Sequence, residues 1–264
     1  MKVYVTVLTN EIYIPGLKAL KRSLLKVKSK YKLCILLKSG AYELKNLLKE
    51  NNVLDDYCFL VYSEDINNIN NLTEKMPFHR WNETFFKLRV CDLVQFEKIV
   101  LLDSDMLIMK NIDSLFDSPS FSAVQADSIC KSSYLALNSG LMVLEPSKEL
   151  YNKLVELIEP SFNKKIKMGE FCGDQDIFRD YDLEWQNKKH LILPLTYNVY
   201  FSYLNNLKKN FNYKFSEIFV IHFIGKIKPW ELTFKKKTHS FIKMLLHFSF
   251  FKIKIFCKYL RYCK

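Results

Sequence analysis

An apolar segment that ends in two carboxylates constrains this chain more than any other feature. Residues 99–102 read Ile-Val-Leu-Leu, and Asp103-Ser104-Asp105 follows directly. Such a run is typical of a buried central strand, and open α/β sheets bind ligands at the carboxyl ends of their strands. Two carboxylates that face one point attract a divalent cation. The segment therefore predicts a strand that delivers Asp103 and Asp105 to a metal site, and a plain turn with a capping Asp is the simpler alternative.

Strand and helix patterns alternate along the chain around this segment. Strands are predicted over residues 3–8, 32–37, 57–61, 106–109, 121–126, 140–144 and 218–221. Helices are predicted over residues 13–25, 42–48, 81–96 and 150–158, and after Asp174. With 264 residues, 49% of them hydrophobic, the chain can bury a sizeable core. The order is typical of βαβ units, so we expect an α/β fold with a Rossmann-like mixed sheet flanked by helices.

Polar clusters follow the predicted strands, whereas the usual dinucleotide, P-loop and zinc-hydrolase motifs do not occur. Thr9-Asn10 and Tyr13 follow the first strand, Asn138-Ser139-Gly140 opens a later one, and Asp174-Gln175 precedes a helix. A segment from His222 to Trp230, H-F-I-G-K-I-K-P-W, follows the last strand. Taken singly, each cluster is compatible with a turn, a helix cap or a half-buried histidine.

In this order the clusters resemble those of the glycogenin-like retaining glycosyltransferases, glycosyltransferase family 8, which have the GT-A fold. The resemblance runs from about Val3 to Trp230. It implies an enzyme that transfers a hexose from a UDP-sugar to an acceptor and forms an α-glycosidic linkage. It also implies a catalytic domain over residues 1–232 and leaves residues 233–264 as a separate C-terminal tail.

The resemblance implies roles for individual residues. Asp103, Asp105 and His222 would hold a Mn²⁺ ion, and two hard oxygens with one imidazole suit that metal. The same three residues would also bind the donor. The other donor-binding residues would be Val7, Thr9, Asn10, Tyr13, Lys87, Ser104, Asn138, Ser139, Gly225 and Lys228. Arg80 is the candidate for an arginine that the family carries upstream of Lys87.

Three residues are the catalytic candidates. Lys228 would neutralise a phosphate oxygen as UDP leaves, because a cation stabilises the charge that develops there. Asp174 and Gln175 would stabilise the oxocarbenium-like sugar, with neither assigned as a covalent nucleophile. The acceptor is expected to be a glycan, a glycolipid or a protein. A self-glucosylating initiator, with an acceptor tyrosine among Tyr197, Tyr200 and Tyr203, is an alternative.

Two interpretations from other classes stay open. A haloacid-dehalogenase-type phosphatase also places Asp-x-Asp after an apolar strand, and Asp103 would then be its nucleophile. The usual threonine pattern is missing after Asp105. A catalytically idle sugar-nucleotide-binding protein would keep the same residues without turnover. Mn²⁺-dependent release of UDP from a UDP-sugar separates these interpretations from the transferase.

The positive charge of the chain lies mostly in the tail and the seven residues before it. Residues 226–264 contain eleven Lys and Arg against one acidic residue, Glu231, and so carry +10 of the formal net charge of +12. Basic residues recur at helical spacing from Lys243 to Arg261, with aromatic residues off that stripe. A basic amphipathic helix on anionic lipid and a helix docked on the body by its aromatics both fit this pattern.

Composition also bears on partners and compartment. No reader motif or basic groove precedes the tail, so no specific nucleic acid is expected. Seven scattered cysteines without C-x-x-C spacing predict reduced thiols. A strand pattern that begins at Val3 leaves no room for a signal peptide, and lysines interrupt every apolar run. We therefore expect a cytoplasmic protein with peripheral membrane contact through residues 233–264; a homodimer stays open.

Overall fold

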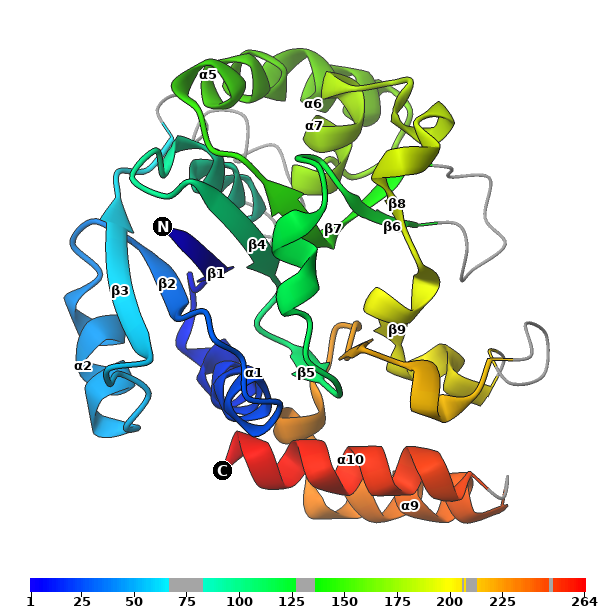
Figure 1. Cartoon of the computed structure of the whole chain (residues 1–264). Coiled ribbons are helices and arrows are strands. Elements are labelled where there is room, and N and C mark those ends of the chain that lie inside the picture. Colours follow the sequence, from blue (N-terminus) through cyan, green and yellow to red (C-terminus); the bar gives the residue numbers. More distant parts are fainter. Residues whose placement is uncertain (67–82, 127–135, 206, 208–212, 247–248) are drawn as a thin grey trace.

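A mixed β-sheet forms the centre of the molecule (Figure 1). The computed structural model describes residues 1–66, 83–126, 136–205, 207, 213–246 and 249–264. Within these residues the strand order of the sheet is β3-β2-β1-β4-β7-β6-β8. Its strands are β1 (Lys2–Val7), β2 (Leu33–Lys38), β3 (Cys58–Ser63), β4 (Lys98–Leu102), β6 (Ala123–Gln125), β7 (Leu137–Leu144) and β8 (Ile192–Leu193). β1 to β4 are mutually parallel, whereas β7 runs antiparallel to both β4 and β6.

Helices cover both faces of this sheet because its strands are apolar on both sides. Val3 and Ile99 face the side covered by α5 (Lys148–Glu156), α6 (Ile158–Lys167), α7 (Asp174–Tyr181) and a 3₁₀ helix, Thr84–Asp92. Tyr4 and Val100 face the side covered by α1 (Ile14–Lys26) and α2 (Tyr42–Glu50). The predicted three-layer α/β architecture is confirmed.

A second, smaller sheet brings late segments of the chain to the end of β4. It contains β5 (Met106–Ile108), β10 (Val220–His222) and β9 (Val199–Tyr200), in the order β5-β10-β9. β5 begins directly after Asp105, and its first residue, Met106, lies opposite His222. His222 therefore lies beside the two carboxylates although it is more than one hundred residues further along the chain.

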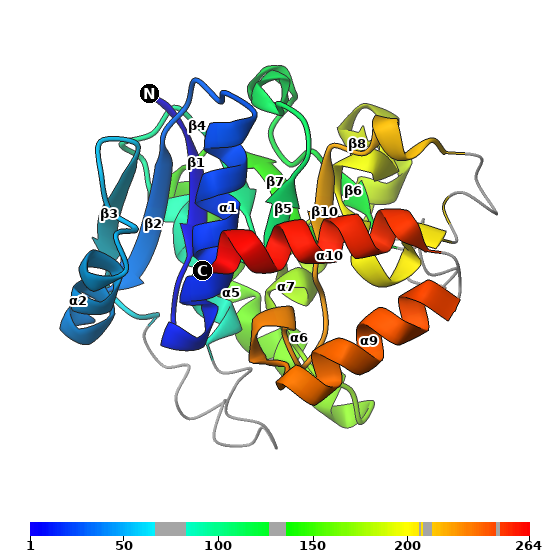
Figure 2. The ribbon, with the colours of Figure 1, turned by 90° about the horizontal axis from the view of Figure 1, so that it is seen from below.

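The tail contains two helices rather than one continuous stripe. α9 (Phe234–Leu246) is followed by α10 (Phe250–Cys263), which folds back along it (Figures 1 and 2). α10 lies against α1, where Ile255, Phe256 and Tyr259 are buried. Of the two predicted arrangements of the tail, α10 therefore adopts the one in which a helix docks on the body through its aromatic residues. The predicted basic stripe crosses both helices, and His247, one of its members, lies outside the described residues.

Element boundaries differ from the predictions in two informative places. The helix predicted over residues 81–96 is described from Thr84 to Asp92 as a 3₁₀ helix in which most side chains are buried, so packing outweighs α-helix propensity. β7 begins at Leu137 because it pairs there with Gln125 of β6. Asn138 and Ser139 therefore lie inside this strand instead of preceding it.

Gly16 of α1 allows the side chain of Trp230 and the backbone of Ser104 to approach the helix closely. A Cβ atom on Gly16 would lie 2.6 Å from Trp230 Cη2 and 2.8 Å from the carbonyl oxygen of Ser104. The indole of Trp230 donates to the carbonyl of Ile12 at 2.8 Å. The segment after β10 is thereby held against the start of α1.

We predict that Gly16→Ala lowers the free energy of unfolding by about 1–3 kcal/mol, because the added methyl overpacks this contact. Urea-unfolding midpoints would measure the change. Leu25→Ala, at an exposed position of the same helix, is the matched control and is expected to change stability by no more than ~0.5 kcal/mol. A more stable Gly16→Ala variant, as helix propensity alone would produce, would contradict this packing argument.

Candidate active site

The predicted site residues line one cavity of about 910 Å³ at the edge of the sheet where β1 and β4 end and β7 begins. The antiparallel pairing of β4 with β7 creates this convergence, because the amide of Asp103 donates to the carbonyl of Gly140 at 2.9 Å. From β1 and the segment after it come Val7, Thr9, Asn10 and Tyr13; the other predicted residues in the lining are Lys87, Asp103, Ser104, Asp105, Asn138, Ser139, Asp174, Gln175, His222, Gly225 and Lys228.

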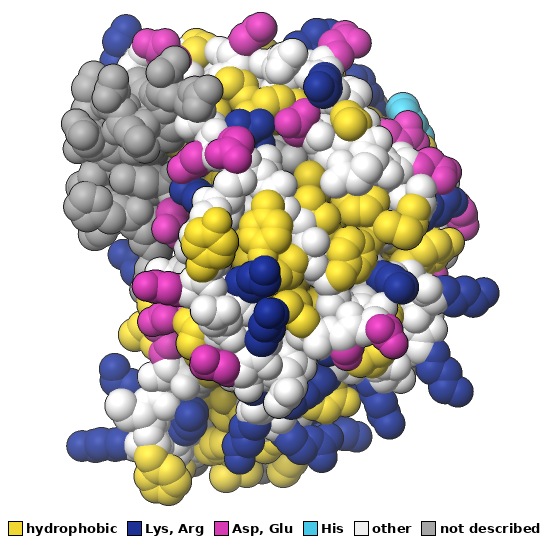
Figure 3. All heavy atoms as spheres, turned by 90° about the vertical axis from the view of Figure 1, so that its left-hand side faces the viewer, with side chains coloured by type: hydrophobic (Ala, Val, Ile, Leu, Met, Phe, Trp, Pro, Cys, Tyr) yellow, Lys and Arg dark blue, Asp and Glu magenta, His cyan; other side chains and the backbone are white. Residues whose placement is uncertain are grey.

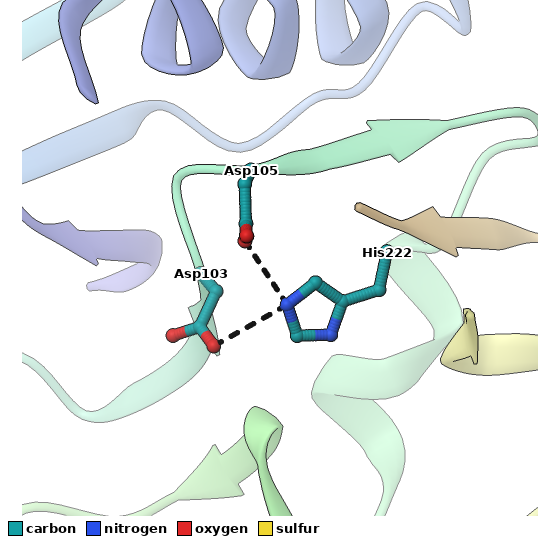
Figure 4. Close-up of side chains that lie close together, drawn as sticks. All are labelled: Asp103, Asp105 and His222. Carbon is teal, nitrogen blue, oxygen red and sulfur yellow. Dashed lines mark ion pairs between the residues drawn. The ribbon is translucent and has the colours of Figure 1, made fainter. Parts of the chain in front are cut away.

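Two carboxylates and one imidazole of the cavity lining point toward one another (Figure 4). His222 Nε2 lies 3.0 Å from Asp105 Oδ1 and 3.6 Å from Asp103 Oδ2. One ligand atom from each of the three residues can be chosen so that all lie within 4.8 Å of one another. Asp103 and Asp105 flank the turn between β4 and β5, so both side chains reach the same point. This donor set fits a divalent cation.

Two lysines compensate the buried carboxylates. Lys228 Nζ donates to Asp105 Oδ2 at 2.6 Å, and Lys87 Nζ donates to Asp103 Oδ1 at 2.6 Å. Lys87 Nζ also lies 3.3 Å from Asp174 Oδ2, so it bridges two carboxylates. Three carboxylates thus face two ammonium groups in the innermost part of the site. The remaining negative charge favours a further cation.

These contacts shift the pKa values in different directions. Burial raises the pKa of the Asp103 carboxyl, and Lys87 and His222 oppose this only in part. Burial also acts to raise the pKa of Asp105, but His222 and Lys228 outweigh it and hold that pKa well below its usual range. For Lys87, burial acts to lower the pKa, and the carboxylates of Asp103 and Asp174 raise it nevertheless. Asp105 and Lys87 are therefore charged at neutral pH.

A chain of amides supports His222 from behind. His222 Nδ1 lies 3.0 Å from Asn198 Oδ1, and Asn198 Nδ2 donates to Asn138 Oδ1 at 2.8 Å. Asn138 Nδ2 in turn donates to the hydroxyl of Tyr200. Since the amide oxygen of Asn198 accepts a hydrogen bond, it favours a proton on Nδ1 of His222 and leaves Nε2 facing the carboxylates.

The segment after β10 closes one side of the cavity. The amide of Phe223 donates to the carbonyl of Asp105 at 3.0 Å, which fixes the start of the segment. Gly225 has φ = +129°, a conformation that side chains with a Cβ rarely adopt. The glycine therefore lets the chain turn, so that Lys228 returns to the carboxylates.

Next to this segment, the start of α1 forms another part of the cavity. Asn10 caps the short helix Glu11–Tyr13, since its side-chain oxygen accepts from the amide of Ile12 at 2.9 Å. The ring of Tyr13 packs edge to face against Trp230, with 6.4 Å between ring centroids. This part offers an aromatic ring and the NH₂ group of the Asn10 amide to a planar ligand.

The start of α7 carries Asp174 and Gln175 into the cavity. Asp176 caps the helix by accepting from the amide of Gly173 at 3.0 Å. Gln175 Oε1 accepts from the amide of Ser139 at 3.3 Å, which joins the helix to β7. The helix terminus and the strand therefore hold these two side chains near the carboxylate cluster.

The lining also contains residues to which the sequence assigned no role in metal or donor binding. They are Ile12, Glu83, Thr84, Gly140, Phe171, Tyr200, Ile224 and Lys226, and Asn198 stands behind the lining. Tyr200 is one of the tyrosines considered as an acceptor, and Ile224 and Lys226 lie within the segment from His222 to Trp230. Their places in these two segments were the sequence features that could have indicated a position in the cavity lining. Arg80, the candidate upstream arginine, lies outside the described residues.

The architecture and the site together define a class of protein. A mixed sheet of this order, with an Asp-x-Asp turn at the carboxyl edge of its parallel half, is the GT-A fold of glycosyltransferases. The galactosyltransferase LgtC, solved with donor and acceptor sugar analogues, is similar in fold, with a TM-score of 0.60 and 13% identity over 89% of this chain and 91% of that one. Apo GlyE of Streptococcus pneumoniae TIGR4 has a TM-score of 0.59 and 20% identity over 88% of this chain and 57% of that one.

The chain belongs to glycosyltransferase family 8, because the sequence profile "Glycosyl transferase family 8" matches residues 4–233. Human glycogenin-1 is 30% identical over 241 residues, which cover 90% of this chain and 64% of glycogenin-1. The uncharacterized protein R707 of Acanthamoeba polyphaga mimivirus is 33% identical over 246 residues, 86% of this chain and 82% of that protein. The predicted family and fold are confirmed.

We predict that Asn198→Leu weakens the binding of a divalent cation at Asp103, Asp105 and His222 about 10- to 100-fold, because His222 loses the partner that orients its ring. Isothermal titration calorimetry with Mn²⁺, in the absence of any sugar nucleotide, would measure the affinity. Asn152→Leu, on the exposed surface of α5, is the matched control and should bind Mn²⁺ like the parent protein. Unchanged affinity in a folded Asn198→Leu variant would exclude the orienting role.

Proposed function

We propose that this chain is a Mn²⁺-dependent retaining glycosyltransferase that transfers a hexose from a UDP-sugar to a glycan, glycolipid or protein acceptor and forms an α-glycosidic linkage. The cluster of Asp103, Asp105 and His222 with Lys228, at the edge of the sheet where donors are expected to bind, carries the proposal. Family membership makes a haloacid-dehalogenase-type phosphatase with Asp103 as nucleophile the weaker interpretation.

Asp103, Asp105 and His222 are the proposed ligands of the metal. Their two carboxylate oxygens and one imidazole nitrogen suit Mn²⁺, and the excess of buried carboxylate over ammonium charge favours a cation there. A metal ion bound there would supply positive charge to the leaving diphosphate. Lys228, on the same side of the cavity, would add a second cation to that leaving group.

The rest of the donor would extend along the cavity on both sides of the metal ligands. Val7, Thr9, Asn10 and Tyr13 are the proposed nucleobase residues, and the ring of Tyr13 and the NH₂ group of Asn10 support this assignment. Ser104 would lie near the ribose. The proposed sugar-binding residues are Lys87, Asn138, Ser139, Asp174 and Gln175, which also line the cavity.

In this proposal the acceptor attacks the sugar on the same face from which UDP departs. The anomeric configuration of the sugar is therefore retained. Asp174 and Gln175 would stabilise the positive charge that develops on the sugar, and the hydrogen bond between Gln175 and Ser139 would keep the side chain in place. No carboxylate needs to form a covalent intermediate. The charge balance at the leaving group is then the main contribution to catalysis.

A self-glucosylating initiator is the second candidate, and one observation favours it. The side chain of Tyr200 lines the cavity, with its hydroxyl held by Asn138. A tyrosine in this place could accept a sugar within its own chain. Tyr200→Phe removes that acceptor, so intact protein mass before and after incubation with the donor would decide whether Tyr200 is modified.

We also propose that residues 233–264 contact an anionic membrane surface, with the protein in the cytoplasm. In the described part of the chain no helix is long and apolar enough to span a bilayer. Lysine and arginine side chains gather on the lower part of the molecule, where α9 and α10 lie (Figure 3). Phe234, at the start of α9, is 87% exposed beside three consecutive lysines. Co-sedimentation with phosphatidylserine vesicles, but not with phosphatidylcholine vesicles, is the expected result.

The first experiment is a donor panel. We expect release of UDP from one UDP-hexose in the presence of Mn²⁺, with at least a hundredfold loss when EDTA removes the metal, because the leaving diphosphate then loses its charge compensation. UDP formation with and without added glycans would be the measurement. Mn²⁺-dependent UDP binding without release from any donor would instead identify an idle binding protein. Failure to bind UDP at all would refute the proposed function.

We predict that Asp174→Asn and Gln175→Ala each reduce transfer by about 10²- to 10³-fold while the affinity for UDP changes less than threefold. The reason is that both side chains would act on the sugar rather than on the nucleotide. Steady-state kinetics and calorimetric titration with UDP and Mn²⁺ would separate the two properties. Glu159→Gln, on the exposed surface of α6, is the control. If transfer and UDP affinity fall together, these residues bind the donor and do not catalyse.

A further inference from the structure

A second cavity of about 310 Å³ lies between the segment after β10 and the two C-terminal helices. Its described lining comes from three separate parts of the chain and contains eight apolar residues, among them Phe201, Phe223, Ile224, Ile227, Met244 and Phe256. The five polar residues of the lining are Ser202, Asn205, Ser240, Ser249 and Lys252. This volume is within the range of small-molecule sites. The proposed donor and metal residues do not line it, so the proposed donor site leaves this cavity unexplained.

The second cavity adjoins the first. Ile224 lines both cavities, and Phe201 of the second cavity directly follows Tyr200 of the first. Ile224 therefore lies at the boundary between the two cavities. A single molecule that lies across Ile224 can therefore reach the donor cavity with one end and the second cavity with the other.

Stacked aromatic rings form part of the wall of the second cavity. Phe223 stacks on Tyr259 of α10, with 3.7 Å between ring centroids, and also stacks on Phe201 at 4.8 Å. Phe223 and Phe256 are buried, whereas Ile227 at the rim is 57% exposed. An exposed isoleucine beside an apolar cavity offers surface that a ligand can cover.

The charge of the lining restricts the occupant. Among the described residues that line the second cavity, Lys252 is cationic and none is acidic. Lys252 Nζ donates to the carbonyl of Ser202 at 2.9 Å and lies over the ring of Phe201. A cationic ligand therefore finds no counter-ion here, and an apolar chain finds surface to bury.

We propose that the second cavity binds the apolar chain, alkyl or isoprenoid, of a lipid-linked glycan acceptor whose sugar end enters the donor cavity across Ile224. The inference rests on the proposed function and specifies its acceptor. The base, the sugars and the diphosphate of a UDP-sugar are already assigned to the first cavity, and none of them is an apolar chain that gains by burial here. The acceptor is the remaining substrate.

Titration with alkyl glucosides tests the proposal on the full chain. Methyl, hexyl and octyl β-D-glucopyranoside, each below its micelle concentration, share one sugar and differ only in the chain. We expect octyl glucoside to shift the NMR signals of the Ile224, Ile227 and Met244 methyl groups, and methyl glucoside not to shift them. The affinity should rise by up to about fourfold for each added methylene, which corresponds to ~0.8 kcal/mol per buried group.

Two substitutions on α9 provide the matched comparison. Ser240→Trp fills the second cavity and should weaken octyl glucoside binding at least tenfold, with unchanged Mn²⁺-dependent UDP affinity. Ile242→Trp, at a position of the same helix that is 50% exposed, should leave both affinities unchanged. Ile242 also serves as the control methyl group, because shifts there equal to those at Ile227 would indicate nonspecific detergent binding and overturn the proposal.

The outcomes separate this inference from the proposed function. Octyl glucoside binding that Ser240→Trp removes, in a protein that binds UDP with Mn²⁺, supports an acceptor subsite. UDP binding without any effect of chain length overturns the subsite and leaves the transferase proposal intact. If UDP does not bind, the proposed function fails, and the acceptor role fails with it even where the octyl chain binds.

Discussion

The concentration of negative charge at the end of β4 is the constraint on which the rest of the site depends. Asp105 is buried and Asp103 is only partly exposed, and Asp174 approaches from another element. Such a cluster is stable only when cations from elsewhere reach it. Lys87 comes from sixteen residues before Asp103, and Lys228 from 123 residues after Asp105. Neutralising these carboxylates therefore joins the middle of the family 8 domain to its last part.

Aromatic contacts hold the same segment in place from the other side. Phe223 stacks on Tyr259 of the C-terminal helix α10, and Trp230 packs against Tyr13 and bonds to the carbonyl of Ile12. Between these two anchors the chain needs only the left-handed turn at Gly225 to return Lys228 to Asp105. α10 therefore supports the segment that closes the cavity, in addition to carrying basic residues on its surface.

The sequence predicted those elements that are specified by residues close together in the chain. The Asp-x-Asp strand, the parallel strands before it and the segment from His222 to Trp230 were all visible, because each combines a hydrophobic pattern with a short polar motif. Asn198 was not, since a single asparagine resembles any turn residue until β9 pairs with β10 and brings it to His222. The division of the tail into α9 and α10 was also missed, because the periodicity of basic residues alone does not mark where a helix turns back.

The two lysines of the site differ in how readily they can respond to a ligand. Lys87 is buried between two carboxylates from separate elements, and its ammonium group already forms ion pairs with both. Lys228 has one carboxylate partner and the carbonyl of Phe223, and its segment contains the left-handed turn at Gly225. Moving its ammonium group toward a phosphate costs one ion pair, which a more highly charged phosphate oxygen can replace. Lys228 is therefore the better candidate for stabilising a leaving group, and Lys87 for keeping Asp103 and Asp174 compatible in one cavity.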